Sequence, residues 1–371
     1  MSFYEKFGEY DYSNFKKYLD NEDKDLVLNV LKKEKINFFD YLYLLSNGAK
    51  KVLPQIASLA RELTIKRFGK VINFYAPIYL SNECSNSCIY CGFNHSKEIK
   101  RTTLTKDEIE KELIALKEVG FDSVLLLTGE SPKIAGLDYI KEAVIMAKKY
   151  FTYIGLEIYP MSEEEYRELV KAGANGLTIY QETYHKETYD KVHLKGRKKN
   201  FEWRLDTPDR AFLAGFRKVG IGALLGLYDL KYEASIIGLH AEYLQKKYWR
   251  GEVTLSFPRI NPKETGFDIP YSVTDKDLVQ MLCALRIFLP DTPFLLSTRE
   301  KPEFRDKLIE LCITQMSAGS KTNPGGYTKD DAKEQFEVSD KRSLSEMLEV
   351  VKNKGYDPVL KDWEENFLGI I

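Results

Sequence analysis

The spacing of apolar residues changes near residue 70. Before it, apolar residues recur at helical spacing, most clearly in Asp23–Lys33 and Val52–Phe68. After it, continuous apolar runs rich in β-branched and aromatic residues recur, as is typical of strands buried on both faces. Eight runs are expected to be strands: Val71–Leu80, Ser123–Thr128, Tyr153–Tyr159, Gly176–Tyr180, Ile221–Leu227, Val253–Pro258, Phe294–Ser297 and Ile313–Met316.

Helical segments with recognisable ends separate most of these runs. Thr105 and Ser162 are each followed three residues later by glutamate, which is the capping-box pattern of a helix start. Thr274 is expected to begin another helix. Glycine is common just after a helix C-terminus. The glycines expected to end helices are Gly120, Gly173 and Gly220.

Eight β/α alternations predict a parallel (β/α)8 TIM-type barrel. We expect an N-terminal helical extension over residues 1–70, the barrel over 71–320, and a C-terminal loop, helix and tail over 321–371 that pack on or near the barrel. Active sites of such barrels lie at the C-terminal ends of the strands. The residues that carry the chemistry should therefore follow the expected strands.

Composition narrows the class of protein. The chain has 371 residues and a formal net charge of −1, so no basic surplus indicates binding to nucleic acid. No apolar run approaches the roughly 20 residues of a membrane span. The first residues lack the charged-then-apolar pattern of a secretory signal. We expect a cytoplasmic protein with neither a membrane nor a nucleic-acid partner.

The most informative motif is a cysteine triplet, Cys84, Cys88 and Cys91. Three thiolates in one short loop can hold an iron–sulfur cluster, and a four-iron cluster with three protein ligands keeps one iron open for substrate. Zinc sites prefer four ligands in paired C-x2-C units, and a fourth ligand from His95 would give an uncommon spacing. Five cysteines are too few for a disulfide framework, which leaves three structural cysteines as the plain alternative.

This C-x3-C-x2-C string, with the aromatic Tyr90 before its last cysteine, resembles the radical S-adenosylmethionine (SAM) superfamily. The resemblance implies a [4Fe–4S] cluster on Cys84, Cys88 and Cys91, with SAM chelating the open iron and Tyr90 beside the cofactor. It also implies one-electron reduction of the SAM sulfonium. The 5′-deoxyadenosyl radical so released would then take a hydrogen atom from the substrate.

The resemblance assigns cofactor roles to two more strand ends. Gly129 permits close approach of the backbone, and the carboxylate of Glu130 suits an ammonium group, so both are expected at the methionine amino group of SAM. Glu157 lies in an apolar strand, where a charge needs a partner. It is expected to bind the ribose hydroxyls or the amino group, the alternative being a carboxylate satisfied at the sheet edge.

The fourth and fifth strands complete the expected cofactor site. Gln181 and Glu182 lie in a Gln-Glu-Thr-Tyr-His stretch that resembles the radical SAM tyrosine lyases, and they are expected to bind SAM. Arg204 can match the SAM carboxylate with two parallel bonds, unless it forms a surface salt bridge with Glu202 or Asp206. Ala223 is expected beneath the adenine, by likeness to the corresponding strand of the superfamily.

The last three strands should face the substrate. The segments that follow them are Phe257–Pro262, Ser297–Glu300 and Ser317–Ser320. Arg259 and Arg299 would both point into the barrel mouth, which indicates an anionic ligand group such as an amino-acid carboxylate. Phosphate binding by the glycine-rich loop after the eighth strand is the alternative.

Taken together, the motifs resemble the 2-iminoacetate synthases, the tyrosine lyases of bacterial thiamine biosynthesis. The resemblance implies cleavage of L-tyrosine between Cα and Cβ to 2-iminoacetate and p-cresol. It also implies substrate contacts from Tyr79, Arg299 and Ser317, with Ser320 as the alternative serine. The segments that carry it are Tyr79–Cys84, the cysteine triplet, Tyr180–His185, Phe257–Pro262, Leu296–Glu300 and Lys361–Trp363.

Two alternatives stay open, a tryptophan lyase with the same motifs and a non-catalytic iron–sulfur electron carrier. Expected partners are thiazole synthase, which would contact Trp363 and Phe367, and a flavodoxin- or ferredoxin-type electron donor. A sister lyase that matures [FeFe]-hydrogenase has an extra C-terminal domain with a second cluster. Here Cys283 and Cys312 lie in apolar stretches and are expected to be core residues.

Overall fold

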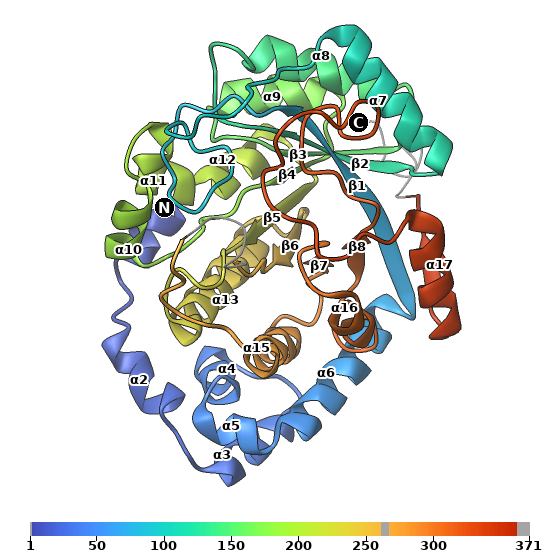
Figure 1. Ribbon diagram of the computed structural model, residues 1–371. Helices are drawn as coiled ribbons and strands as arrows, with labels where there is room; N and C mark the ends of the chain where they lie inside the picture. Colours follow the sequence, from blue (N-terminus) through green and yellow to red (C-terminus); the bar gives the residue numbers. More distant parts are fainter. Residues whose placement is uncertain (1, 261–266, 362–371) are drawn as a thin grey trace.

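The computed structural model describes residues 2–260 and 267–361. Eight parallel strands close into a barrel, because β1 pairs with both β8 and β2. Figure 1 looks into this barrel, with helices around it. The strands are β1 (Val71–Ser81), β2 (Ser123–Thr128), β3 (Tyr153–Glu157), β4 (Gly176–Thr178), β5 (Lys218–Gly222), β6 (Glu252–Ser256), β7 (Phe294–Leu296) and β8 (Gln315–Ser317). The predicted barrel is confirmed.

Helices join and cover the strands of the barrel. Thr105 and Ser162 each close a capping box at the start of α7 and α9, as predicted, and Thr274, expected to begin a helix, also closes one at the start of α15. The helices of this part are α7 (Lys106–Val119), α8 (Leu137–Ala147), α9 (Glu163–Ala172), α10 (Lys186–Val192), η1 (Arg197–Lys199), α11 (Phe201–Leu205), α12 (Thr207–Ala214), α13 (Leu230–Lys247), α15 (Asp275–Phe288), α16 (Pro302–Ile309) and α17 (Leu344–Asn353).

Residues 3–68 form a series of helices that pack on the outside of the barrel (Figure 1). Tyr41 donates to the carbonyl oxygen of Ala234 on α13, and its ring stacks on Phe288 of α15 at 4.7 Å between centroids. Buried aromatic contacts of this kind stabilise the attachment. These helices are α1 (Phe3–Phe7), α2 (Ser13–Leu19), α3 (Lys24–Leu31), α4 (Phe38–Leu44), α5 (Asn47–Lys51) and α6 (Leu53–Phe68).

The fifth strand was predicted in the wrong place. It covers Lys218–Gly222, whereas residues 223–227 leave the ladder and continue as a buried irregular segment. Apolarity reports burial, and this segment is buried without being a strand. Gly220 therefore lies inside the strand instead of after a helix; Gly215, with φ of 103°, ends α12. Gly120 and Gly173 end helices in the left-handed conformation, as expected.

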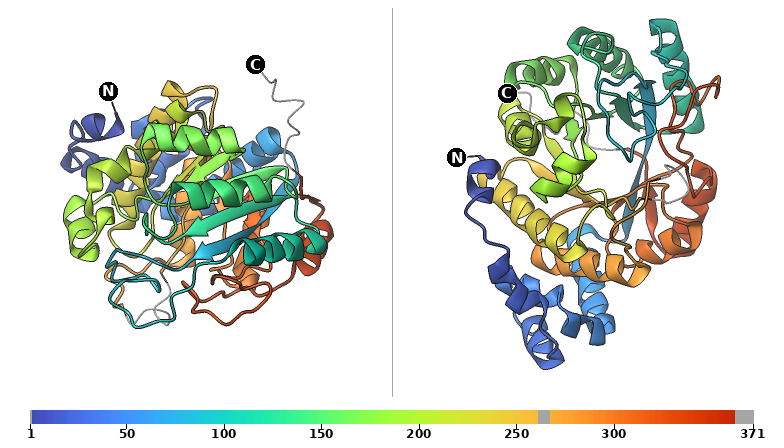
Figure 2. Two further views of the ribbon diagram at one scale, coloured as in Figure 1. Left: turned by 90° about the horizontal axis from the view of Figure 1, so that it is seen from above. Right: turned by 60° about the vertical axis from the view of Figure 1, so that its left-hand side comes forward.

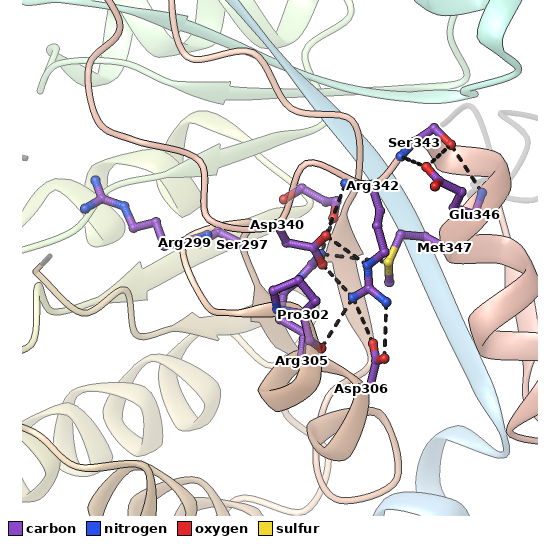
Figure 3. A network of polar contacts seen from close by, with 11 residues as sticks. Ser297, Arg299, Pro302, Arg305, Asp306, Asp340, Arg342, Ser343, Glu346 and Met347 are labelled. Carbon is purple, nitrogen blue, oxygen red and sulfur yellow. Dashed lines mark hydrogen bonds and ion pairs between the residues drawn. The ribbon is translucent and has the colours of Figure 1, made fainter.

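The long loops after β1 and β8 lie at the same end of the barrel, the end to which the strands point (left view of Figure 2). The chain after β8 is held by a buried ion pair, in which Arg305 of α16 binds Asp340 and also donates to the carbonyl oxygen of Ser317. Arg342 binds the same aspartate (Figure 3). An additional short strand, β9 (Asp357–Val359), pairs with the start of β1.

Within the described part of the chain, no helix has both the length and the apolarity needed to cross a bilayer.

Candidate active site

The cysteine loop leaves the end of β1 and folds back over the barrel mouth. A tight turn brings the Cys91 amide to the carbonyl oxygen of Cys88 at 3.1 Å. The thiols of Cys84, Cys88 and Cys91 are free, and all three line one cavity of about 620 Å³. His95 is exposed and directs Nδ1 to the carbonyl oxygen of Cys84 at 3.1 Å, which does not support its role as a fourth ligand.

Charged residues from the end of β3 and from the segments that follow β2 and β4 also line this cysteine cavity. Gly129 follows β2, and a Cβ atom there would lie 2.3 Å from the carbonyl oxygen of Glu83, so only glycine fits this close to the cysteine loop. Glu130 is buried and accepts from Asn86 Nδ2 at 2.6 Å. Both residues therefore lie in the predicted cofactor site.

Glu182 has the unusual backbone φ of 71°, a left-handed conformation that costs energy in a non-glycine residue. Its carboxylate binds the ammonium group of Lys198 at 2.6 Å, and Arg204 Nη2 lies 3.7 Å away. All three side chains line the cysteine cavity. Buried charges persist only when paired, so Glu182 holds two cations beside the thiols.

Arg204 is buried on α11, and its Nε donates to the carbonyl oxygen of Tyr180 at 2.7 Å. It forms a surface salt bridge with neither Glu202 nor Asp206, which were the alternatives for this residue; its carboxylate neighbour is Glu182. Since Nε is used, the other guanidinium nitrogens remain directed into the cavity region. The position suits the carboxylate of a bound amino acid such as the methionine part of SAM.

Sequence reasoning missed Lys198. This lysine belongs to a run of cations, which is typical of a solvated surface, yet its ammonium is buried against Glu182 and lies 5.6 Å from the centre of the Tyr90 ring. Tyr90 is buried and its hydroxyl pairs with His193 Nε2 at 2.8 Å. Only the lack of any acidic neighbour within the run could have suggested a distant partner.

Glu157 lies between the cysteine cavity and a second one. Burial, with Glu182 nearby, raises the pKa of its carboxyl to about 7, while the cations Arg299, Lys198 and Arg204 act in the opposite direction. The alternative for Glu157, a carboxylate satisfied at the sheet edge, does not hold, since the residue lines both cavities. Near neutral pH the group can hold or release a proton.

The second cavity, of about 990 Å³, lies inside the barrel mouth and shares its wall with the first. Tyr79, Arg299 and Ser317, which are expected at the substrate from sequence, all line it. The hydroxyl of Tyr79 donates to Gln335 Oε1 at 2.7 Å. Arg299 extends away from the Asp340 network in Figure 3, and its guanidinium lies 3.5 Å from the centre of the Phe336 ring.

The two serines after β8 differ in their partners. Ser317 hydrogen-bonds the hydroxyl of Tyr75, which lowers the pKa of that phenol against the raising effect of burial. The Ser320 hydroxyl is buried, lines the same cavity, and has no partner within the described residues. A buried polar group without a partner is costly, so Ser320 is the serine available to a ligand.

The inner end of this cavity carries phenol hydroxyls. Tyr75 precedes Tyr79 on β1 by four residues and therefore lies deeper in the barrel. Tyr180 lines the same depth, and its hydroxyl pairs with Ser256. Both tyrosines also line a small cavity below, so they form the floor between the two spaces.

Three sequence expectations are not met by the placement of side chains. Gln181 and Ala223 are buried but line neither cavity; Gln181 donates weakly to the carbonyl oxygen of Phe201. Arg259 is turned away from the mouth, because Glu300 binds its Nε at 2.9 Å and its Nη1 donates to the backbone. The mouth therefore receives one of the two expected arginines.

The thiol set fits an iron–sulfur cluster by its chemistry. In the described ranges no three His, Cys, Asp or Glu side chains gather around one point as ligands of a single metal ion would. A cluster differs, since each thiolate binds a different iron atom. The Phe93 amide donates to Cys91 Sγ at 3.4 Å, a type of contact that tunes clusters. Burial raises the pKa of Cys88 to about 12, so a metal's own charge would stabilise the thiolate.

Comparisons with known proteins agree with this site. Residues 78–235 match the radical SAM superfamily, and residues 256–357 match the biotin and thiamin synthesis associated domain. The 2-iminoacetate synthase of Escherichia coli (strain K12) is 39% identical over 370 residues, which cover 99% of this chain and 98% of that protein. The enzyme of the same name from Salmonella typhimurium is 44% identical over 88% of this chain and 87% of that protein.

Solved structures of relatives share the whole architecture. The [FeFe]-hydrogenase maturase HydG superposes with a TM-score of 0.89 at 35% identity, over 94% of this chain and 79% of that chain. HydG from Carboxydothermus hydrogenoformans gives a TM-score of 0.84 at 34% identity, over 96% and 82%. The cysteine loop, the charged cavity and the sequence similarity over nearly the full length of the chain lead to one conclusion. The chain belongs to the 2-iminoacetate synthase family of radical SAM enzymes, whose members use SAM and an iron–sulfur cluster.

Proposed function

We propose that this protein cleaves the Cα–Cβ bond of L-tyrosine to 2-iminoacetate and p-cresol, with methionine and 5′-deoxyadenosine formed from SAM. The observation that carries the proposal is the common wall of the two cavities. Cys91, Glu157, Tyr180, Glu182, Lys198 and Gln335 line both of them. A cofactor beside the thiols and an amino acid in the barrel would therefore meet across this wall.

We propose that the cluster is of the [4Fe–4S] type, held by Cys84, Cys88 and Cys91. Three protein ligands leave one iron for the amino and carboxylate groups of SAM. When bound, the cluster and SAM supply a 5′-deoxyadenosyl radical after the uptake of one electron. Glu130 and Arg204 suit the two charged ends of the methionine part, since one is an anion and the other a cation lining the same cavity.

The second cavity would orient the substrate. Arg299 provides a guanidinium that can hold the tyrosine carboxylate by two parallel bonds, and Ser320 offers an unpaired hydroxyl. Tyr79, fixed by Gln335, lies between this end and the cysteine loop. Holding the amine of the substrate toward the shared wall is the main contribution of these residues, because orientation can supply much of the rate enhancement.

The floor of the cavity supports tyrosine over tryptophan. Hydroxyl groups of Tyr75, Tyr180, Ser256 and Ser317 gather there in two hydrogen-bonded pairs. A substrate phenol can join such a network as both donor and acceptor, whereas an indole offers one N–H donor. A site built to bond a hydroxyl also discriminates strongly against analogues without one.

An electron carrier without catalytic activity is the alternative of another class. Such a protein needs four ligands for its cluster and has no use for a lined cavity beside it. The buried charges Glu157, Glu182, Lys198 and Arg204 would then be costly without benefit. Formation of 5′-deoxyadenosine from SAM distinguishes the two, because a carrier forms none.

Two protein partners belong to the same proposal. 2-Iminoacetate hydrolyses readily, which favours direct transfer to thiazole synthase; the candidate contacts Trp363 and Phe367 lie outside the described residues. A pull-down of thiazole synthase with and without residues 360–371 tests their role. A flavodoxin- or ferredoxin-type protein would supply the electron. The free thiols suit a reducing compartment such as the cytoplasm.

Anaerobic incubation of reconstituted protein with SAM, dithionite and each aromatic amino acid tests the reaction. We expect p-cresol and 5′-deoxyadenosine with tyrosine only. Cleavage of tryptophan in place of tyrosine would contradict the substrate assignment, and SAM left intact under all conditions would contradict the reaction class.

A further inference from the structure

Positive charge is concentrated beside the cysteine loop, in the segment between α10 and α11. Residues 191–201 contain five lysine or arginine residues and no acidic residue. The inward residues of this segment, His193 and Lys198, belong to the cofactor site already described. Leu194, Lys195, Arg197 and Lys199 are exposed instead, and together they are called the 194–199 surface.

The backbone under this surface is bonded directly to the cysteine loop. Leu194 and Ser87 are joined by a 3.0 Å hydrogen bond, and the Ser87 amide bonds the carbonyl oxygen of Lys195 at the same distance. Cys88 pairs with His193 in an antiparallel bridge. Gly196 has φ of 94°, and a Cβ atom there would lie 2.1 Å from Asn86 Oδ1. One layer of backbone therefore separates the 194–199 surface from Cys88.

The exposed side chains of this surface are available for a partner. None of Lys195, Arg197 and Lys199 forms an ion pair with another residue in the part of the chain that the structure describes. Leu194 is an exposed apolar residue among them, at 57% relative exposure. Arg197 and Lys199 also line a surface groove of about 1090 Å³ together with the exposed Trp203 and one acidic residue, Glu165. Cations around a small apolar and aromatic centre are typical of a protein interface.

We propose that the 194–199 surface docks the acidic protein that delivers the electron. The proposal rests on the function proposed above, which requires one electron for each SAM cleaved. The donor protein loses one electron and the cluster gains it. That electron then enters the sulfonium as the C5′–S bond breaks, giving methionine and the 5′-deoxyadenosyl radical. Because the rate of electron transfer falls steeply with distance, the single layer of backbone over Cys88 favours the 194–199 surface as the place where the electron enters.

Charge complementarity is the reason for an acidic partner. A cluster of unpaired cations speeds the encounter with an anionic surface and weakens as salt screens it. The chain as a whole carries a net charge of −1, so the attraction would be local to this surface and would orient the donor. Orientation matters here, because a productive encounter must place the donor's redox group over Cys88.

The test compares Lys195→Glu/Arg197→Glu with a matched control, Lys66→Glu/Lys111→Glu, which makes the same change of charge on exposed residues of α6 and α7. The probe is an acidic flavodoxin. Its Kd is measured by fluorescence titration at several salt concentrations. Flavodoxin-driven and dithionite-driven formation of 5′-deoxyadenosine are then measured separately.

We expect the Kd of the 195/197 variant to rise about tenfold or more and to lose most of its salt dependence. Dithionite-driven activity should stay at the level of the control. A Kd equal to that of the control would overturn the proposal. So would loss of dithionite-driven activity in step with the flavodoxin-driven activity, or a defect confined to binding of an RNA or DNA oligonucleotide. The Kd is independent of tyrosine cleavage, so failure of the proposed reaction would be seen separately.

Discussion

The two halves of the barrel mouth are built from different kinds of side chain. The half formed by β1–β4 and their loops contributes Glu130, Glu157, Glu182, Lys198 and Arg204 to the cavities. The half formed by β6–β8 contributes hydroxyls and, among the described lining residues, the single charge of Arg299. Paired charges suit a charged cofactor that must be held the same way in every turnover. Hydroxyls around one cation suit an amino acid with a polar ring, so under the proposed function the division would separate cofactor from substrate.

Among changes that test the difference between the two halves, a substitution in the cysteine loop should have the largest effect. Cys88→Ala should remove the cluster and all SAM cleavage, since two thiolates and an alanine leave the cluster with too few ligands. Iron and sulfide analysis after anaerobic reconstitution measures this. Cys283→Ala is the control: it is equally buried but lies 3.8 Å from Cys312 in the core, so it should keep its iron and lose only about 1 kcal/mol of stability. Four irons retained by Cys88→Ala would contradict the ligand assignment.

A change in the charged half should weaken the binding of SAM. Arg204→Gln removes the cation while Lys198 still neutralises Glu182. Loss of a hydrogen bond to a charged group is worth about 1.5–3 kcal/mol, so SAM should bind roughly 10- to 100-fold more weakly. Equilibrium binding to the reconstituted protein measures it. The KM for tyrosine should change little, and a larger effect on tyrosine than on SAM would place Arg204 in the wrong half.

A change in the hydroxyl half should leave SAM cleavage intact but uncouple it from the cleavage of tyrosine. Arg299→Lys keeps the charge but loses the fork that fixes the rotation of a carboxylate. We expect several-fold less p-cresol for each 5′-deoxyadenosine formed, because more of the SAM cleavage would be abortive. Product ratios by chromatography measure the coupling. A normal ratio would remove Arg299 from the substrate site.

The floor of the cavity should set selectivity for the phenol. Tyr180→Phe removes one hydroxyl from the network with Ser256, and an unmade bond of this kind costs about 1 kcal/mol. The KM for tyrosine should rise about fivefold, while the affinity for SAM stays the same. Steady-state kinetics with saturating SAM checks this, and Tyr166→Phe, a buried tyrosine on α9, is the control. An equal effect in both variants would indicate a packing role only.

The smallest expected effect concerns a buried carboxyl behind the charged half. Glu233 of α13 accepts from the Thr183 hydroxyl and from the Tyr184 amide at 2.9 Å, and burial raises its pKa to about 8. The folded protein then holds a proton that the unfolded chain releases near the ordinary glutamate pKa of 4.5, so this group's contribution to stability falls as pH rises from about 4.5 to about 8. Glu233→Gln mimics the protonated form and should flatten that dependence.

Thermal unfolding of the wild type and Glu233→Gln at pH 6 and pH 8 tests the sign of this effect. We expect the variant to lose less Tm between the two pH values than the wild type does. Equal losses in the two proteins would mean that the carboxyl is already ionised in the folded protein at pH 6.

Sequence patterns predicted the barrel and most of the site because both depend on local signals. Capping residues such as Thr105 mark where a helix begins, and the cysteine spacing marks the loop that follows β1. The irregular segment after Gly222 was wrongly predicted as strand, because a buried segment has the same composition whether or not it joins the ladder. Apolarity alone could not separate the two.

The features that could not be predicted depend on contacts between residues far apart in the sequence. Gln335 lies in a polar stretch without periodicity, yet it reaches Tyr79 and Cys91 across more than half of the chain. Arg259 and Arg299 follow strands in the same way, and the ion pairs of Arg259 with Glu300 and Asp275 turn it from the mouth. β9 is too short and polar to differ from a loop until its pairing with β1 is known.

The pairing of β1 has a consequence for how the protein is made on the ribosome. Asn73 pairs with Gln315, and Val71 pairs with Asp357, so the first strand to emerge waits for partners synthesised roughly 240 to 290 residues later. At 5–20 residues per second, this delay is roughly 10 to 60 s. Throughout it the thiols after β1 are present while Gln335 has yet to be synthesised. Strand order therefore sets an interval in which nascent chains are open both to cluster loading and to oxidation.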